Sequence, residues 1–208
     1  MLRMSTRDQH PFLGMLKSPK QTLTSLFYDA RFLWAFLILW LGGISGITII
    51  SRLQNVGEDT SLLTILLSVI IGGFVMGILG WFLFSILYMF FGSLFGGRGD
   101  FSHIQIATAY SLTPLATNTI LTIIPLLFLQ AHFFQVQSNA LSMFSSITLL
   151  VFSIIEGVAL LWSFLLTVAS VSEAHRLSFG KSFLTVFFSW IIVLVILFGM
   201  LLTFNTWS

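Results

Sequence analysis

The sequence predicts an all-α integral membrane protein, built as a bundle of five transmembrane helices. Of its 208 residues, 57% are hydrophobic and only 8% are charged, whereas a soluble domain carries about 25% charged residues. The mean hydropathy is +1.01. Several uncharged stretches exceed the roughly 18–20 apolar residues that are needed to cross a hydrocarbon layer about 30 Å thick. A soluble fold could not bury this much apolar surface.

A short helix is expected ahead of the first span. Ser18 and Pro19 have the residue types of an N-cap followed by a proline at the first helical position. This helix could lie in the cytoplasmic headgroup layer, or it could simply extend the first span. We therefore expect residues 1–31 to be a cytoplasmic or interfacial segment and residues 32–208 to be the transmembrane domain. The apolar residues that recur at helical spacing are Leu23, Leu26, Phe27 and Ala30.

The five expected spans are bounded by charged or turn-forming residues. The first has five basic residues ahead of it and no A-x-A cleavage site behind it, which indicates a retained signal anchor. The second is longer than one crossing requires, so it should tilt or be interrupted at Gly72 and Gly73. Pro114 and Pro125 should kink the third. The spans cover residues 32–50, 62–91, 106–129, 143–171 and 183–204.

The positions of lysine and arginine predict which way the chain crosses the membrane, because cytoplasmic loops retain positive charge. Only Arg52 falls on the side opposite to the N-terminus. This distribution places the N-terminus in the cytoplasm, and five crossings then place Trp207 and Ser208 outside. The eight basic residues on the predicted inner side are Arg3, Arg7, Lys17, Lys20, Arg31, Arg98, Arg176 and Lys181.

Glu156 lies well inside the fourth span, where a charged group costs about 2.5–3.5 kcal/mol on insertion scales. Its side chain should therefore face the bundle or be protonated. Hydroxyl residues, including Ser153 and Ser163, share its helix face. This face is either a proton or solute path or a packing seam in which small residues allow close approach. Asn118 or Tyr110, in the third span, could donate a hydrogen bond to the carboxylate.

Small residues four positions apart occur twice in the first two spans. Gly42 and Gly46 form one such pattern, and Gly73 and Gly77 form the other. Patterns of this kind allow two helices to approach closely. We expect them to mark contact faces within the bundle.

The sequence gives little support for enzymatic chemistry or for a cofactor. It contains no cysteine, and its four histidines show neither an H-E-x-x-H pair nor ligand spacing, so no metal site is expected. Residues 97–100 match the G-x-G-D string of intramembrane aspartyl proteases, but that mechanism needs two carboxylates that share a proton. The second aspartate is missing, because Asp8, Asp29 and Asp59 all fall outside the spans and Asp100 itself falls in a loop. A net charge of +2 from so few charges does not indicate nucleic-acid binding.

Two loops at the predicted cytoplasmic face carry most of the remaining polar residues. One follows the second span and the other follows the fourth. They could dock a protein partner, or they could be capped turns whose charges set the topology and complement the helix ends. The candidate docking residues are Arg98, Asp100, His103, Glu173, His175, Arg176 and Lys181.

Three segments carry a resemblance to a known family. They are Ser18-Pro19, the run from Phe95 to Phe101 (FGGRGDF) that leads to residues 109–114 (AYSLTP), and Trp162 followed by residues 171–181 (VSEAHRLSFGK). The chain resembles the YIP family of Ypt/Rab-interacting membrane proteins, and more specifically its bacterial relatives. The resemblance implies five membrane helices, a cytoplasmic N-terminus, no enzymatic activity and a role in binding or organising other proteins at a membrane.

Two functions of different classes are compatible with these features. The first is a non-catalytic adaptor, or an assembly or regulatory factor, for another membrane complex such as an ABC-type exporter. The second is a small transporter or channel that uses the buried Glu156. The expected surroundings are the lipid bilayer and a membrane-protein partner. The short N-terminal segment and the absence of cysteine favour a bacterial cell membrane over a Golgi membrane.

Overall fold

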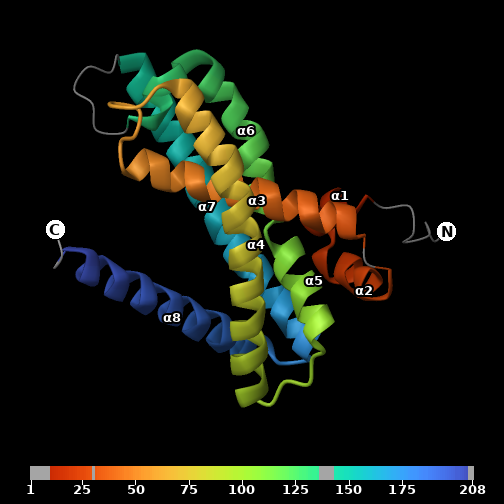
Figure 1. The fold of residues 1–208 in the computed structure, drawn as a ribbon. Helices are drawn as coiled ribbons and strands as arrows, with labels where there is room; N and C mark the ends of the chain where they lie inside the picture. Colours follow the sequence, from red (N-terminus) through yellow and green to blue (C-terminus); the bar gives the residue numbers. More distant parts are fainter. Residues whose placement is uncertain (1–9, 30, 136–142, 206–208) are drawn as a thin grey trace, which may run out of the picture.

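The computed structural model describes residues 10–29, 31–135 and 143–205, and in these ranges it is helical with no strand. Five helical segments are long and apolar enough to cross a membrane. This confirms the predicted all-α bundle of five spans, while the sidedness of the termini stays a prediction. In chain order the elements are α1 (Pro11–Lys17), α2 (Pro19–Tyr28), α3 (Phe32–Leu53), α4 (Leu62–Leu94), α5 (Phe101–Ser111), α6 (Thr113–Leu129), the 3-10 helix η2 (Gln130–Phe134), α7 (Met143–His175) and α8 (Phe179–Asn205) (Figure 1).

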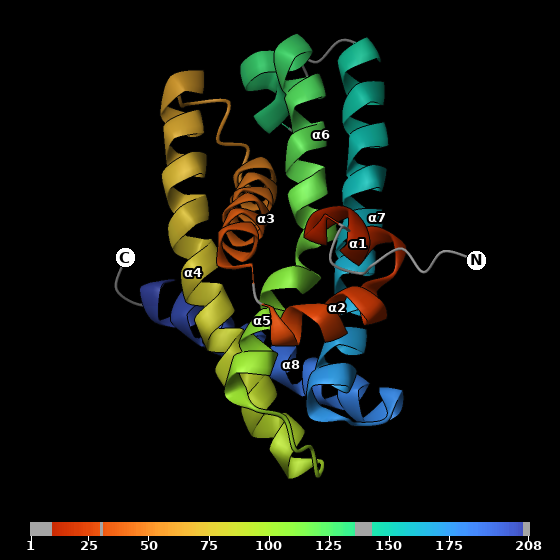
Figure 2. The same cartoon turned by 90° about the vertical axis from the view of Figure 1, so that its right-hand side faces the viewer.

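The long helices lie side by side, with α3 between α4 and α6 (Figure 2). The predicted interruption of α4 at Gly72 and Gly73 is wrong, because α4 runs unbroken from Leu62 to Leu94. Its glycines serve packing instead. A Cβ atom on Gly43 of α3 would overlap the carbonyl oxygen of Gly73, and one on Gly77 would overlap the carbonyl oxygen of Leu39.

The small-residue patterns therefore lie partly where they were expected. Gly73 and Gly77 do face α3, as the spacing predicts. On α3, however, the glycine that meets them is Gly43, whereas Gly42 faces the side chain of Leu112 and a Cβ on Gly46 would meet nothing within 4 Å. The three glycines of α3 therefore differ in their surroundings: Gly43 contacts the backbone of α4, Gly42 faces Leu112, and Gly46 borders open space.

The third span is divided into α5 and α6, and the break falls at Leu112, just before Pro114. A proline has no backbone N–H, so Pro114 cannot donate to the carbonyl of Tyr110 one turn earlier. The hydroxyl of Thr113 donates to that carbonyl instead, at 2.6 Å. Pro125 lies inside α6 without ending it. The kink expected at Pro114 is thus confirmed, and it is sharp enough to separate two helices.

Helix α2 begins at Pro19, as the sequence predicts, and its apolar face packs on the bundle. Leu23 and Leu26 are buried in one core with Tyr110 and Val168. Phe27 stacks on His103 with ring centroids 4.5 Å apart. The seven-residue helix α1 was not predicted, and Ala30 lies outside the described residues.

Helix α8 packs mainly on α4 and α7 and then diverges from the rest of the bundle (Figure 1). Aromatic side chains hold its first half: Phe188 stacks on Phe91 at 6.0 Å, and Trp190 lies 5.4 Å from Phe84. Val186 is buried, but the residues around Val195 are exposed. Residues 194–196 therefore present apolar side chains away from the bundle, as a lipid-facing segment would.

Candidate functional site

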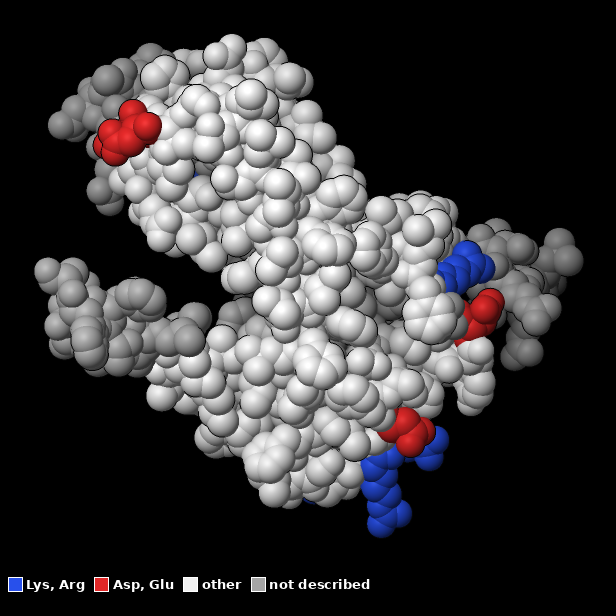
Figure 3. Space-filling model, viewed as in Figure 1, with Lys and Arg blue, Asp and Glu red and all other residues white. Residues whose placement is uncertain are grey.

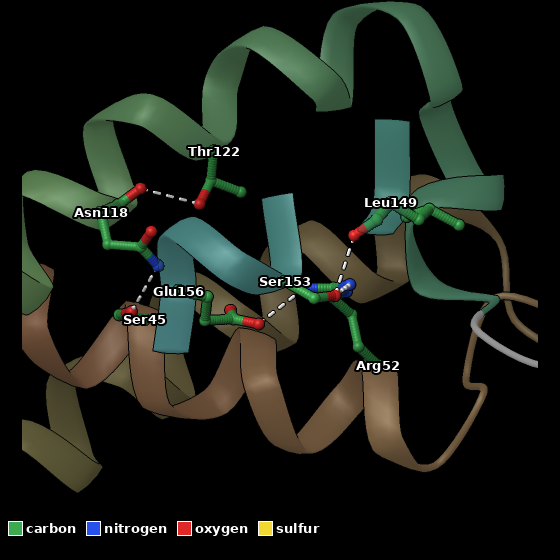
Figure 4. A network of polar contacts seen from close by, with 7 residues as sticks. All are labelled: Ser45, Arg52, Asn118, Thr122, Leu149, Ser153 and Glu156. Carbon is green, nitrogen blue, oxygen red and sulfur yellow. Dashed lines mark hydrogen bonds and ion pairs between the residues drawn. The ribbon is translucent and has the colours of Figure 1, made fainter. Parts of the chain in front are cut away.

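A buried ion pair joins α3 to α7. Arg52, in the last turn of α3, donates from Nη1 to the Oε2 atom of Glu156 at 2.7 Å, and from Nη2 to the hydroxyl of Ser153 at 2.9 Å (Figure 4). Arg52 is 3% exposed and Glu156 is 8% exposed. The predicted end of the first span, which left Arg52 outside it, is wrong, because α3 continues for three residues past Ile50 and includes Arg52. The buried charge of Glu156 is thereby compensated.

Two aromatic rings enclose the guanidinium group of Arg52. Its central carbon lies 4.9 Å from the ring centroid of Phe133 and 5.6 Å from that of Phe152. Phe133 is 0% exposed and comes from η2, the short helix that closes the bundle at the end of α6. A cation over an aromatic face is stabilised by the ring quadrupole, and more strongly where water is excluded. The rings therefore exclude water from the side of the ion pair that faces η2.

The hydrogen bond that the sequence suggested between Glu156 and Asn118 or Tyr110 is not formed. Asn118 donates to the hydroxyl of Ser45 at 3.2 Å, and Tyr110 donates to the backbone carbonyl of Arg31 at 3.0 Å. The carboxylate takes the arginine because a charge-assisted hydrogen bond is stronger than a neutral one. Asn118 instead ties α6 to the middle of α3, and Tyr110 ties α5 to the residue just before α3.

The hydroxyl residues of α7 are mostly satisfied by nearby backbone. Ser153 donates to the carbonyl of Leu149 at 2.8 Å, and Thr167 donates to that of Ser163 at 2.8 Å, each one turn back along the helix. Ser163 reaches across to the carbonyl of Ser111 at 2.9 Å. The bond from Ser163 joins α7 to α5, while the other two stay within α7, and hydroxyl groups satisfied in these ways are typical of a packing seam. Within the described ranges, Glu156 Oε1 has no hydrogen-bond partner.

A second cluster forms where the α4–α5 loop meets the end of α7. We call residues 95–100 and 172–181 the loop junction. His175 is 1% exposed and accepts a hydrogen bond at Nδ1 from the backbone N–H of Gly99, at 3.3 Å. Its Nε2 lies 3.0 Å from the carbonyl of Tyr88. Because Nδ1 accepts, the proton must sit on Nε2, which donates to Tyr88, so the imidazole is neutral. The backbone N–H of Arg98 also donates to the carbonyl of His175, at 3.1 Å.

Glycines make room for the imidazole of His175. A Cβ on Gly92 would overlap the ring, one on Gly97 would lie 2.6 Å from Nδ1, and one on Gly99 would lie 3.0 Å from the same atom. Lys181 closes the junction from α8 by donating to the carbonyl of Phe95 at 3.1 Å. The glycine-rich loop therefore wraps a side chain of the protein itself.

The structure brings the predicted docking residues together at the loop junction and its edge. All of them except His175 are at least partly exposed. Arg98, Asp100, Arg176 and Lys181 are exposed, whereas His175 is buried and organises the loop from within. Glu173 and His103 are half-buried. Glu173 forms an ion pair with Lys20 of α2 at 3.4 Å, and His103 lies 4.0 Å from Asp100.

Sequence reasoning missed the partners of both buried groups. Arg52 follows the polar residue Ser51, so a hydropathy scan ends the span before it. Its partner is 104 residues away along the chain. The signal that could have found it is the uncompensated charge of Glu156, which requires a basic partner. The close spacing of Gly92 with Gly96, Gly97 and Gly99 could likewise have indicated that another group packs tightly against this part of the chain.

Known proteins were compared with the chain as a whole. No curated protein and no solved structure matches it. The Yip1 domain, however, matches residues 13–200, from within α1 to the second half of α8, and so includes the ion pair and the loop junction. The chain therefore belongs to the Yip1 domain family of multi-pass membrane proteins.

Proposed function

We propose that this protein is a non-catalytic adaptor, or an assembly or regulatory factor, that binds another membrane complex through the loop junction. A bacterial exporter of the ABC type is the partner class we favour, and the bacterial cell membrane is the proposed location. One observation carries the proposal. The backbone of the junction is locked around His175, while charged side chains of both signs point away from it.

A locked backbone with free side chains suits a docking surface. Arg98 and Arg176 form no ion pair with any residue of the described ranges. Their charges remain available to a partner, and the loop that presents Arg98 has already lost its conformational freedom. Binding through such a surface avoids most of the ordering cost that a flexible loop would incur.

The position of Arg52 supports a cytoplasmic location for the junction. Once Arg52 is withdrawn into the bundle, no lysine or arginine remains on the predicted outer side. Glu58 and Asp59 are exposed at that end. In the view of Figure 3, acidic side chains lie at the upper left, basic and acidic side chains lie along the right and lower right, and uncharged surface separates the two groups. Retention of basic residues on the inner side is the pattern expected of a membrane protein with a cytoplasmic N-terminus.

The test is capture of the full-length protein from its native membrane after mild crosslinking. Charge reversal at the junction, in Arg98→Glu with Arg176→Glu, should strip a specific membrane complex from the captured material. Charge reversal at the opposite end, in Glu58→Lys with Asp59→Lys, is the matched control and should leave that complex in place. Capture of the bare protein, or equal loss of the complex in both variants, would rule out docking at the junction.

The transporter or channel alternative is supported by one observation. Glu156 Oε1 and Arg52 Nε are buried and have no hydrogen-bond partner in the described ranges. The carboxylate thus retains capacity for another hydrogen-bonding group. Against this, its charge is already paired and Phe133 covers the arginine. Purified protein in liposomes should therefore show no proton or solute flux, and flux that disappears in Glu156→Gln would favour the alternative.

A further inference from the structure

A cavity of about 170 Å³ lies between α3, α4, α5, α7 and α8. It is bordered by the middle parts of α4 and α7, at Gly80 and Ser163, and Trp190 of α8 lies beside it. All five helices belong to segments apolar enough to span a membrane. The cavity therefore lies at the depth of the hydrocarbon layer.

Two glycines of this cavity leave space open instead of bringing helices together. A Cβ atom on Gly46 or on Gly80 would meet nothing within 4 Å. Gly43 and Gly73 behave in the opposite way, because a Cβ on either would overlap the backbone of the neighbouring helix. The cavity therefore adjoins the glycine contact that holds α3 to α4, since Gly43 and Gly77 also line it, and its open space lies beside Gly46 and Gly80.

The polar groups around the cavity are already engaged. Ser163, Thr167 and Thr108 each donate a hydrogen bond to a backbone carbonyl, at 2.7–2.9 Å. The indole N–H of Trp81 donates to the carbonyl of Gln105 at 2.8 Å. A buried water needs two to four polar partners. These walls suit an apolar occupant better than water.

The cavity opens toward the lipid. Met76 of α4, Leu160 of α7 and Trp190 of α8 line it and are 46%, 39% and 42% exposed. This is where α8 diverges from the bundle and where α4 and α7 make few contacts (Figure 1). A chain from the bilayer can reach the cavity through this mouth without crossing a polar region.

We propose that the hydrocarbon chain of a bilayer phospholipid inserts between α4 and α7, beside Trp190, and occupies this cavity. An unfilled space inside a packed bundle forfeits dispersion contacts, and an inserted chain restores them. A phospholipid chain is apolar and is abundant at this depth of the membrane. The binding site is independent of the adaptor function proposed above.

Photolabelling of the full-length protein tests the site. The protein is placed in vesicles of phosphatidylethanolamine and phosphatidylglycerol that contain a phosphatidylcholine with a diazirine halfway along one acyl chain. Ser163 and Thr167 line the cavity and are only 5% and 6% exposed, so labelling of either residue requires a chain inside the cavity, whereas the 46% exposed Leu165 between them can be labelled from the surrounding lipid. We expect this labelling in the native protein. We expect it to be lost in Gly46→Leu and in Gly80→Leu, where the new side chain fills the space.

Gly157→Leu is the matched control, because Gly157 is an exposed glycine of α7 with nothing within 4 Å of its Cβ position. It should keep the label at Ser163 and Thr167. Absence of that label in the native protein would overturn the site, as would undiminished labelling in a folded Gly46→Leu or Gly80→Leu variant. Labelling by a free fatty acid carrying the diazirine, but not by the phospholipid, would overturn the assignment to a phospholipid chain.

Discussion

Arg52 and Glu156 are 104 residues apart in the chain, yet their side chains meet at 2.7 Å inside the bundle and join α3 to α7. The pair accounts for two features that look unfavourable when each is taken alone. Glu156 is an acid in the middle of an apolar helix, and Arg52 is a basic residue at the predicted outer end of the bundle, where basic residues are disfavoured. Paired, they leave no net charge in the bundle and no positive charge on the predicted outer surface.

Removing either member of the pair should destabilise the protein strongly. Arg52→Met or Glu156→Met leaves one uncompensated buried charge, which costs about 3–5 kcal/mol where such pairs have been broken. The double variant, Arg52→Met with Glu156→Met, should recover most of that loss, because no unpaired charge remains. Thermal unfolding in detergent measures the effect.

The exposed Glu58 supplies a control for this series, since Glu58→Met should change stability by less than about 0.5 kcal/mol. A double variant whose loss of stability equals the sum of the two single losses would contradict the account of the pair. The two losses would then be independent, and the 2.7 Å contact would contribute nothing.

Gly92→Ala should loosen the loop junction, because the added methyl group overlaps the imidazole of His175. Overpacking of this kind costs about 1–3 kcal/mol. His175→Ala removes the ring and with it the bonds to Gly99 and Tyr88. Since both changes act on one contact, their effects should be non-additive in the double variant.

The rate of tryptic cleavage after Arg98 and Arg176 reports on the same junction. We expect faster cleavage in Gly92→Ala and in His175→Ala, and an unchanged rate in the control Gly180→Ala, whose Cβ would meet nothing within 4 Å. Additive stability losses, or a cleavage rate that does not respond to either change, would show that the imidazole does not organise the loop.

Two neighbouring glycines on α3 should respond differently to the same substitution. In Gly43→Ala the new methyl group meets the backbone of Gly73, which cannot move without separating α3 from α4. In Gly42→Ala it meets the Cβ atom of Leu112 at 3.1 Å, so Leu112 needs to move by only a few tenths of an ångström. Alanine improves helix propensity by about 0.8–1.0 kcal/mol at both positions. The unfolding temperature of Gly43→Ala should therefore be well below that of Gly42→Ala. The reverse order would contradict the close contact of α3 and α4.

Much of the fold follows from the sequence because hydropathy and helix breakers are local signals. The five spans, the start of α2 at Pro19 and the break before Pro114 are all decided within a few residues of where they occur. The α1 helix was missed because its seven residues have no period long enough to recognise.

The two sites were harder to predict because they depend on partners far away in the chain. The sequence places Glu156 in the bundle but does not reveal that Arg52 reaches it. His175 reads as a polar loop residue, and only the packing of residues 92–99 around it shows that it is buried. Arg98 and Arg52 end in opposite surroundings because Arg52 lies within α3 and bonds Glu156 of α7, whereas Arg98 lies in the loop after α4.

Membrane sidedness decides whether the loop junction can meet a cytoplasmic partner, and the chain is well suited to measuring it because it contains no cysteine. Single cysteines are introduced as Asp59→Cys at one end and Arg176→Cys at the other, and intact cells are treated with a membrane-impermeant maleimide. Asp59→Cys should be labelled at once, and Arg176→Cys only after the membrane is permeabilised. Labelling of Arg176→Cys in intact cells, with Asp59→Cys protected, would contradict the cytoplasmic placement of the junction and the docking function that depends on it.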